Sequence, residues 1–296
     1  MDHRLAIATL LCLASPSLCS ADEPSTPTTT TPGEPAQVRE VQATGSQIVV
    51  ELYTSQGCNY CPNAERLLQE MIQKGHGRNR VIPLAFHVDY FNTPWPDPFS
   101  NRFNSGRQWA YHEAFKSRDA NTPDLYFTPM IMVDGRYPMS GYHSKGTGPL
   151  WPLLKARLDR ASRARREASL TLRLESTPDR PAHCSMTIRA QAKTARLSGK
   201  ELLACVAITE GPLTTAVPSG ENAGETLIEH NVVRSLQYET VTLQRDRPTE
   251  VTIPVTLAEG VDPARVQVVA FLQDEATGAM FQATTTPWND PPPPPR

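Results

Sequence analysis

Residues 48–68 read IVVELYTSQGCNYCPNAERLL, and this stretch decides the fold that we expect for the chain. Residues 47–53 form a short, β-branched apolar run, which is typical of a buried strand. From Ala64 to Ile72 apolar residues recur at helical spacing, and Gly75 ends the pattern. A second apolar run, 81–88, predicts another strand. Strand, helix and strand in about 40 residues predict a βαβ unit with parallel strands.

Cys58 and Cys61 form a CxxC motif between the first expected strand and the helix. A cysteine at a helix N-terminus faces unpaired backbone N–H groups and the positive end of the helix dipole, which both stabilise a thiolate. Such positions lower a thiol pKa from about 8.5 to roughly 3.5–7.5. A second thiol one turn later can close or open a disulfide with the first. The motif therefore predicts a redox-active pair, with Cys58 as attacking thiolate and Cys61 as resolving thiol.

Two other interpretations of the CxxC motif remain open. It can be half of a structural zinc site, although the sequence has no second CxxC and its histidines are scattered. It can also be an inert structural disulfide, since an exported protein meets an oxidising compartment.

Further along the chain, the region up to residue 166 mixes helix and strand patterns, whereas the region from residue 168 shows strand patterns only. The first region has turns followed by a weak helix over 94–116, two short strands at 129–133 and 136–140 around Asp134-Gly135, and a helix over 145–166. Expected strands in the second region are 170–174, 184–192, 202–209, 232–243, 249–257, 266–273 and 279–283. We expect an α/β domain over 46–167 and a sandwich-like antiparallel β domain over 168–286.

The two ends of the chain differ from this centre. Residues 1–21 have the charge, short apolar stretch and small residues of a secretory signal peptide, which predicts an exported protein, periplasmic or secreted. Residues 22–45 are rich in Pro and Thr and predict a disordered tether, and residues 287–296 predict a Pro-rich tail. After signal removal no apolar run is long enough for an integral membrane segment. The net charge of −2 offers no basic surface for a nucleic acid.

Cys184 and Cys205 lie in the region of expected strands. If their strands pair as a hairpin, the two residues are offset by about 13 Å along the strands, too far for a disulfide. We therefore expect two buried, unreactive thiols, and a disulfide only if the two strands lie in opposite sheets.

Several segments together resemble a known family. They are the quoted stretch, LAFHVDYF at 84–91, YFTPMIMVDGR at 126–136, SGENAGETL at 219–227 and NVVR at 231–234. They resemble the exported thioredoxin-like proteins catalogued as domain of unknown function 1223, over roughly residues 46–245. The resemblance implies an α/β thioredoxin-like domain. This chain departs from the family in having Asn59-Tyr60 between the cysteines, where small residues are usual.

The thioredoxin resemblance also implies roles for individual residues. It implies that Pro129, after Thr128, is a cis proline lying against the CxxC motif and leaving its backbone open to a substrate chain. Glu51 lies on the strand that leads to the motif, where thioredoxins bury a carboxylate that moves protons for the second cysteine. A salt-bridged or exposed strand residue is the alternative for Glu51.

Four further residues are candidates for the lining of the site. His87 and Asp89 follow the second strand, at the sheet edge where α/β sites gather, and a purely structural pair is the alternative. Tyr60 and Phe127 flank the motif and are candidates, with Thr128, for an apolar surface that binds a peptide substrate. Simple core packing is the alternative for the two aromatic rings. The 221–224 and 231–234 segments suggest packing or interdomain hydrogen bonds.

These observations predict thiol–disulfide exchange with a protein thiol or disulfide as substrate or redox partner. We expect no diffusible cofactor and assign no metal ligands. The alternatives are a non-enzymatic binding module with a structural CxxC, and a soft-metal carrier that binds an ion such as Cu(I) through both thiolates.

Overall fold

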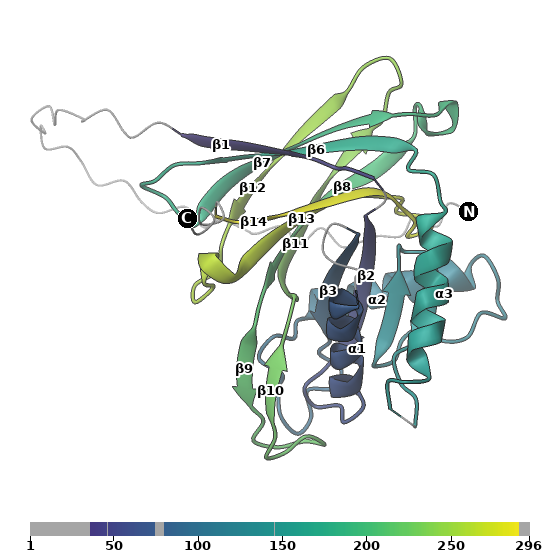
Figure 1. Cartoon of the computed structure of the whole chain (residues 1–296), viewed down its shortest axis with the longest axis vertical. Coiled ribbons are helices and arrows are strands. Elements are labelled where there is room, and N and C mark those ends of the chain that lie inside the picture. Colours follow the sequence, from purple (N-terminus) through teal and green to yellow (C-terminus); the bar gives the residue numbers. More distant parts are fainter. Residues whose placement is uncertain (1–35, 46, 75–79, 145, 290–296) are drawn as a thin grey trace, which may run out of the picture.

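The computed structural model of the protein describes residues 36–45, 47–74, 80–144 and 146–289. Within these ranges the chain forms two β-sheets, a two-stranded ribbon and three α-helices (Figure 1). The expected signal peptide and most of both the expected tether and the expected tail lie outside the described residues.

An eight-stranded mixed sheet runs through the centre of the molecule (Figure 1). Its strands are, in spatial order, β14 (Met280–Pro287), β13 (Val266–Gln273), β8 (Glu201–Glu210), β11 (Val232–Thr242), β3 (Val81–His87), β2 (Ile48–Thr54), β4 (Met130–Val133) and β5 (Tyr137–Ser140). β2 and β3 are parallel, as the βαβ pattern predicts, and β4 and β5 form the expected hairpin. β11 joins β3 through a single bridge, Val232 to Ala85. Strands from before and after residue 167 therefore share one sheet.

Helices cover both faces of the half of this sheet that contains β2 and β3. On one face, α1 (Cys61–Gln73) and α3 (Leu150–Ser162) bury apolar side chains against β2 and β4. On the other face, α2 (Arg102–Lys116) packs against a second apolar cluster that includes Tyr53. α3 is shorter than the expected 145–166 helix, because Pro149 occupies its N-cap and Arg166 turns away to bond Asp134.

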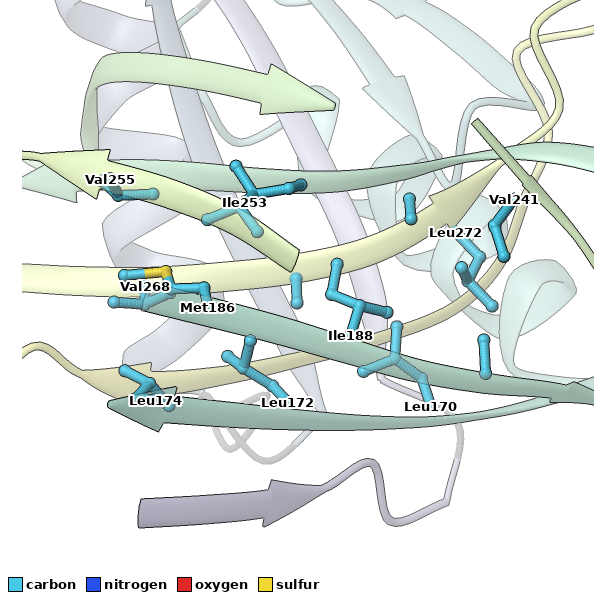
Figure 2. Close-up of a cluster of buried hydrophobic side chains, with 14 of the residues drawn as sticks. Leu170, Leu172, Leu174, Met186, Ile188, Val241, Ile253, Val255, Val268 and Leu272 are labelled. Carbon is cyan, nitrogen blue, oxygen red and sulfur yellow. The ribbon is translucent and has the colours of Figure 1, made fainter. Parts of the chain in front are cut away.

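The second sheet covers the other half of the central sheet (Figure 1). Its strands are, in spatial order, β1 (Gln37–Gln42), β6 (Ala168–Ser176), β7 (His183–Ala192) and β12 (Thr249–Thr256). Alternate residues of β6, β7 and β12 point inward against β8 and β13, forming one apolar cluster between the sheets (Figure 2). This part of the fold is the sandwich that the alternating patterns predict.

Regular structure extends further toward both ends of the chain than the sequence predicts. The sequence pattern places residues 37–42 in the tether, but they form β1, which pairs antiparallel with β6. An exposed edge strand is held by backbone pairing and needs little apolar pattern, so its sequence does not reveal it. At the other end, Pro287, the first residue of the expected tail, belongs to β14. The buried indole of the next residue, Trp288, packs into the sandwich core.

The hairpin that we assumed for the two C-terminal cysteines is wrong. β7 pairs with β6 and β12, whereas β8 pairs with β11 and β13, so the two strands belong to different sheets. Cys184 points into the sandwich core, while Cys205 lies on the opposite face of its own sheet. Both are buried free thiols, because the central sheet separates their side chains.

Three smaller elements complete the fold. A ribbon of β9 (Leu213–Ala216) and β10 (Thr226–Glu229) leaves the central sheet and runs down beside β3 and α1 (Figure 1). Two 3₁₀ turns, Ala195–Leu197 and Pro263–Arg265, lie in connections. Among the described residues, no helix has the length and apolar character needed to cross a bilayer.

Candidate functional site

The CxxC motif occupies the turn from β2 into α1, at the carboxyl end of a parallel strand. Cys61 is the first residue of α1, Tyr60 is its N-cap and Pro62 stands in the first turn, where a missing N–H leaves no bond unmade. The backbone N–H of Cys61 bonds the Cys58 carbonyl at 3.1 Å, closing a tight turn. Both cysteines are free thiols, and both are buried, with 2% and 1% of their surfaces exposed.

The two thiols have different acidities. A hydrogen bond from the Cys61 thiol, with smaller effects from backbone N–H groups and Thr128, lowers the pKa of Cys58 to about 7 against the effect of burial. Burial and the neighbouring Cys58 raise the pKa of Cys61 well above its usual value. Because the thiolate is the nucleophile, this asymmetry favours Cys58 as the attacking sulfur. The exposures of the two thiols hardly differ, so the distinction between them lies in acidity.

The Thr128-Pro129 segment lies beside the motif. The peptide bond between these residues is cis, in the isomer that the resemblance implies. The Thr128 side chain helps to lower the pKa of Cys58, which places it next to that sulfur. On the other side of the loop, a Cβ built on Gly57 would lie 2.9 Å from the Phe91 carbonyl oxygen, so this position accepts only glycine without a shift of the backbone.

A turn in the β9–β10 connection holds the CxxC loop from the outside. The Asn222 amide donates hydrogen bonds to the carbonyl oxygens of Gln56, at 2.8 Å, and of Cys58, at 3.0 Å. The Glu221 carboxylate accepts from the backbone N–H of Asn59 at 3.0 Å. These residues belong to the 221–224 segment, for which the sequence suggested hydrogen bonding but no location. The structure locates these bonds at the CxxC motif.

Glu51 is buried, but its carboxylate points to the opposite face of the sheet from α1. There it forms an ion pair with Arg107 at 2.7 Å and accepts a hydrogen bond from the Tyr111 hydroxyl at 2.6 Å. Of the two interpretations of Glu51, this contact corresponds to the salt-bridged strand residue.

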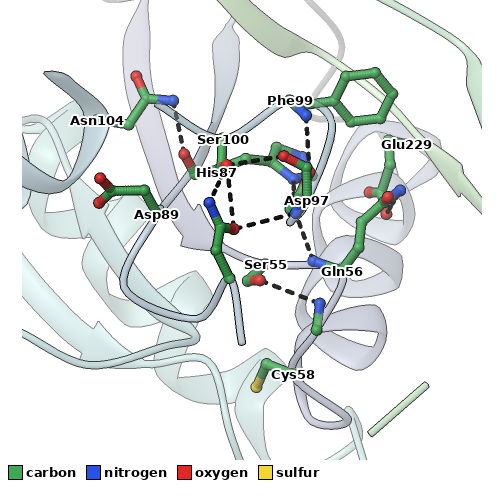
Figure 3. A network of polar contacts seen from close by, with 12 residues as sticks. Ser55, Gln56, Cys58, His87, Asp89, Asp97, Phe99, Ser100, Asn104 and Glu229 are labelled. Atoms are coloured by element: carbon green, nitrogen blue, oxygen red, sulfur yellow. Dashed lines mark hydrogen bonds and ion pairs between the residues drawn. The ribbon is translucent and has the colours of Figure 1, made fainter. Parts of the chain in front are cut away.

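His87 and Asp89 end up with separate partners. The His87 side chain is fully buried, and its Nδ1 lies 2.7 Å from the Asp97 carboxylate (Figure 3). Asp97 also accepts the backbone N–H groups of Gln56 and Phe99. The Asp89 carboxylate bonds the hydroxyl of Ser105 on α2. Asp97, in a loop rich in proline, carried no signal in the sequence.

Two further carboxylates that the sequence analysis did not single out lie beside His87, on the α1 face of the sheet. They are Glu65, one turn after Cys61 on α1, and Glu229 at the end of β10. Burial and the Glu229 carboxylate raise the pKa of Glu65 to about 8. Burial alone would lower the pKa of His87, but the nearby carboxylates, Asp97 above all, raise it to about 9. The four-residue spacing between Cys61 and Glu65 was the available signal, because it places both on one helix face.

Aromatic side chains surround the motif at the surface. Tyr60 is 45% exposed, and its ring lies 4.0 Å from that of Tyr142. Tyr90, Trp109 and Tyr126 form a second exposed or partly exposed group. Phe127 is partly buried and packs against the core below α2. Of the two predicted aromatic residues, Tyr60 is therefore available to a partner and Phe127 mainly to the core.

A comparison with known protein families identifies the family to which the chain belongs. The profile of the family described as protein of unknown function DUF1223 matches residues 49–273. The chain belongs to the DUF1223 family. A search of curated proteins finds no match.

Two solved structures share the fold of this DUF1223 chain. A crystal structure of a protein from Agrobacterium tumefaciens has 22% identity and a TM-score of 0.58, with 86% of this chain and 99% of that chain covered. HBP35 of Porphyromonas gingivalis has 16% identity and a TM-score of 0.57, with 82% of this chain and 75% of that chain covered. The DUF1223 match includes both the CxxC loop and the turn at Asn222, so both belong to the family region.

Proposed function

We propose that this DUF1223 protein is an exported thiol–disulfide exchange protein whose α/β half works as a thioredoxin-like domain. The observation that carries the proposal is the CxxC pair at the start of α1, with a thiolate-favouring Cys58 and a Cys61 that keeps its proton. The cis Pro129 beside the motif is a supporting feature. The export part of the proposal depends on the N-terminal sequence pattern alone.

The reaction that we propose has two steps and needs no diffusible cofactor. The Cys58 thiolate attacks one sulfur of a substrate disulfide, the substrate S–S bond breaks, and one substrate sulfur leaves as a thiolate. Cys61 then loses its proton and attacks Cys58, which releases the second substrate thiolate and leaves a Cys58–Cys61 disulfide. Two electrons pass to the substrate, and the reverse sequence oxidises a substrate dithiol.

The exposed rings of Tyr60 and Tyr142 provide an apolar surface next to Cys58 for an unfolded or extended substrate chain.

The near-complete burial of Cys58 favours a second candidate, a non-enzymatic binding module in which the CxxC pair is structural. Exchange requires that a substrate displace part of the cover over Cys58, whereas a structural pair does not.

Catalysed reduction or oxidation of a peptide disulfide separates the two functions. We expect Cys58→Ser to abolish exchange, Cys61→Ser to accumulate a mixed disulfide with the substrate, and Cys205→Ser, a buried cysteine elsewhere, to retain activity. Full activity of Cys58→Ser would eliminate the exchange function. Equilibration with glutathione then gives the reduction potential of the Cys58–Cys61 pair, and with it the direction of the exchange. A potential of about −120 mV indicates an oxidant, and one of about −270 mV indicates a reductant.

A further inference from the structure

Three potential metal ligands from separate parts of the chain converge beneath the CxxC loop. Glu65 comes from α1, His87 from the end of β3 and Glu229 from the end of β10. One carboxylate oxygen or ring nitrogen of each residue lies within 4.8 Å of those of the other two. Figure 3 shows His87 and Glu229 of this group on either side of Asp97 and Gln56.

Each of the three side chains has a buried polar atom without a partner. Within the described part of the chain, no hydrogen bond reaches Glu65 Oε1, His87 Nε2 or Glu229 Oε2. His87 is 0% exposed, Glu229 is 4% exposed, and the Oε1 atom of the half-buried Glu65 is itself buried, so bulk water does not satisfy these atoms. Leaving a buried polar group unpaired destabilises the fold, and more strongly if the group is charged. Three such atoms on side chains that form one close cluster indicate that they share a partner.

The remaining atoms of the group are held in place. His87 Nδ1 is bound to Asp97, which is itself fixed by the backbone N–H groups of Gln56 at 2.8 Å and Phe99 at 2.9 Å. The Gln56 amide donates to Glu229 Oε1 at 3.1 Å. A carboxylate on one ring nitrogen of a histidine fixes its orientation and leaves the other nitrogen for a metal ion, as in many metal sites. Here that arrangement leaves Nε2 without a partner in the cluster with the two glutamates.

The charges of the group also call for a cation. The carboxylates of Glu65, Glu229 and Asp97 surround a single imidazole in a buried space. Carboxylates removed from water are costly unless a positive charge or a proton compensates them. A divalent ion between Glu65 and Glu229 would compensate both and would leave His87 neutral, in the form that binds metals.

We propose that Glu65, His87 and Glu229 form a binding site for one divalent metal ion of the Zn²⁺ type. One imidazole and two carboxylates suit zinc, whereas Mg²⁺ and Ca²⁺ prefer six or more oxygen ligands. Zinc bonds of about 2.1 Å place tetrahedral ligand atoms about 3.4 Å apart, so atoms that lie up to 4.8 Å apart need to approach one another by up to about 1.4 Å. Rotamer adjustment of the two glutamates can supply such a movement.

Such an ion would connect α1, β3 and the β9–β10 ribbon below the motif. The ribbon carries Asn222, which holds the CxxC loop, and Thr54 lowers the pKa of both Cys61 and Glu65. The site would therefore fix the position of the loop. The proposal concerns residues that take no part in thiol exchange, so it does not depend on that function.

Zinc titration of the full chain tests the proposal. The starting protein carries Cys58→Ser and Cys61→Ser, so that thiolates do not compete, and is stripped with EDTA before calorimetric titration with ZnCl₂ alone. We expect one Zn²⁺ per chain and a higher thermal midpoint with zinc than with EDTA. Glu229→Gln and His87→Gln should each weaken binding at least tenfold. Glu225→Gln, an exposed acid of the same β9–β10 connection, and His183→Gln are the matched controls and should bind as before.

Several results would overturn the proposal. They are the absence of stoichiometric Zn²⁺ binding to the stripped protein, binding that survives in both site variants, and binding equally strong for Mg²⁺ or Ca²⁺. Zinc that binds only when Cys58 and Cys61 are present would assign the metal to the CxxC pair instead. Because the first titration uses no site variant, a folding defect in His87→Gln cannot produce a false result. Circular dichroism of Glu229→Gln establishes that its fold is intact.

Discussion

The hydrogen bond from Cys61 to Cys58 allows a quantitative prediction. This bond is the largest cause of the low pKa of Cys58, about 7, and Cys61→Ala removes it. Since burial then acts without its main opposing effect, the pKa should rise to about 8.5 or above. At pH 6 the thiolate fraction falls from about 9% to about 0.3%, a change of about 30-fold. A more basic thiolate is about fivefold more nucleophilic, so the rate should fall about sixfold.

The assay is the first-turnover reaction of reduced protein with a small chromophoric disulfide from pH 5 to pH 10. We expect a rate midpoint near pH 7 for the native protein and at least 1.5 units higher for Cys61→Ala, with the variant faster at high pH. Cys205→Ala removes a buried thiol outside the motif and should keep the native midpoint. An unchanged midpoint in Cys61→Ala, or a native midpoint already near pH 8.5, would refute the assigned role of this hydrogen bond.

Three further predictions concern residues around the site and in the two cores. Asn222→Ala leaves the buried Gln56 carbonyl oxygen without its donor and the Cys58 carbonyl oxygen with only the Cys61 N–H, so we expect about 1–3 kcal/mol less stability in denaturant unfolding, with Asn222→Gln less severe. Glu51→Gln leaves the Arg107 cation without its buried partner and should lower the free energy of unfolding by about 3–5 kcal/mol. The exchange rate of the folded variant should stay unchanged. Slower exchange by the folded variant would restore Glu51 as a proton carrier. Thiol titration of denatured, unreduced protein should detect Cys184 and Cys205 as free, and their absence would contradict the separation of their side chains by the central sheet.

Local patterns predicted the elements near the CxxC motif well. The strands at 47–53 and 81–88 and the helix between them are present as β2, β3 and α1, because their apolar periodicity is strong and their contacts are close in sequence. The pattern over 145–166 overestimated the length of α3. The composition remains helical up to residue 166, but the helix ends at Ser162 and the Arg166 side chain bonds Asp134.

Pairing between distant strands was predicted less well. Alternation shows that residues 184–192 and 202–209 are strands, but it does not show which strands they pair with. A hairpin between these two strands was the natural choice and was wrong, because β7 pairs with β6 and β12 whereas β8 pairs with β11 and β13. β1 escaped prediction for a related reason, as an edge strand depends on a neighbour that its own residues do not specify.

By itself the sequence determined the βαβ unit and the place of Cys58 and Cys61 at a helix start. These properties depend on short-range periodicity and residue type, which a single segment carries. Only the tertiary structure decided that Asn222 reaches the CxxC loop, that Glu51 turns to Arg107, and that Glu65 and Glu229 meet at His87. Such meetings join residues up to about 170 positions apart, and no local pattern records them because the sheet order brings them together.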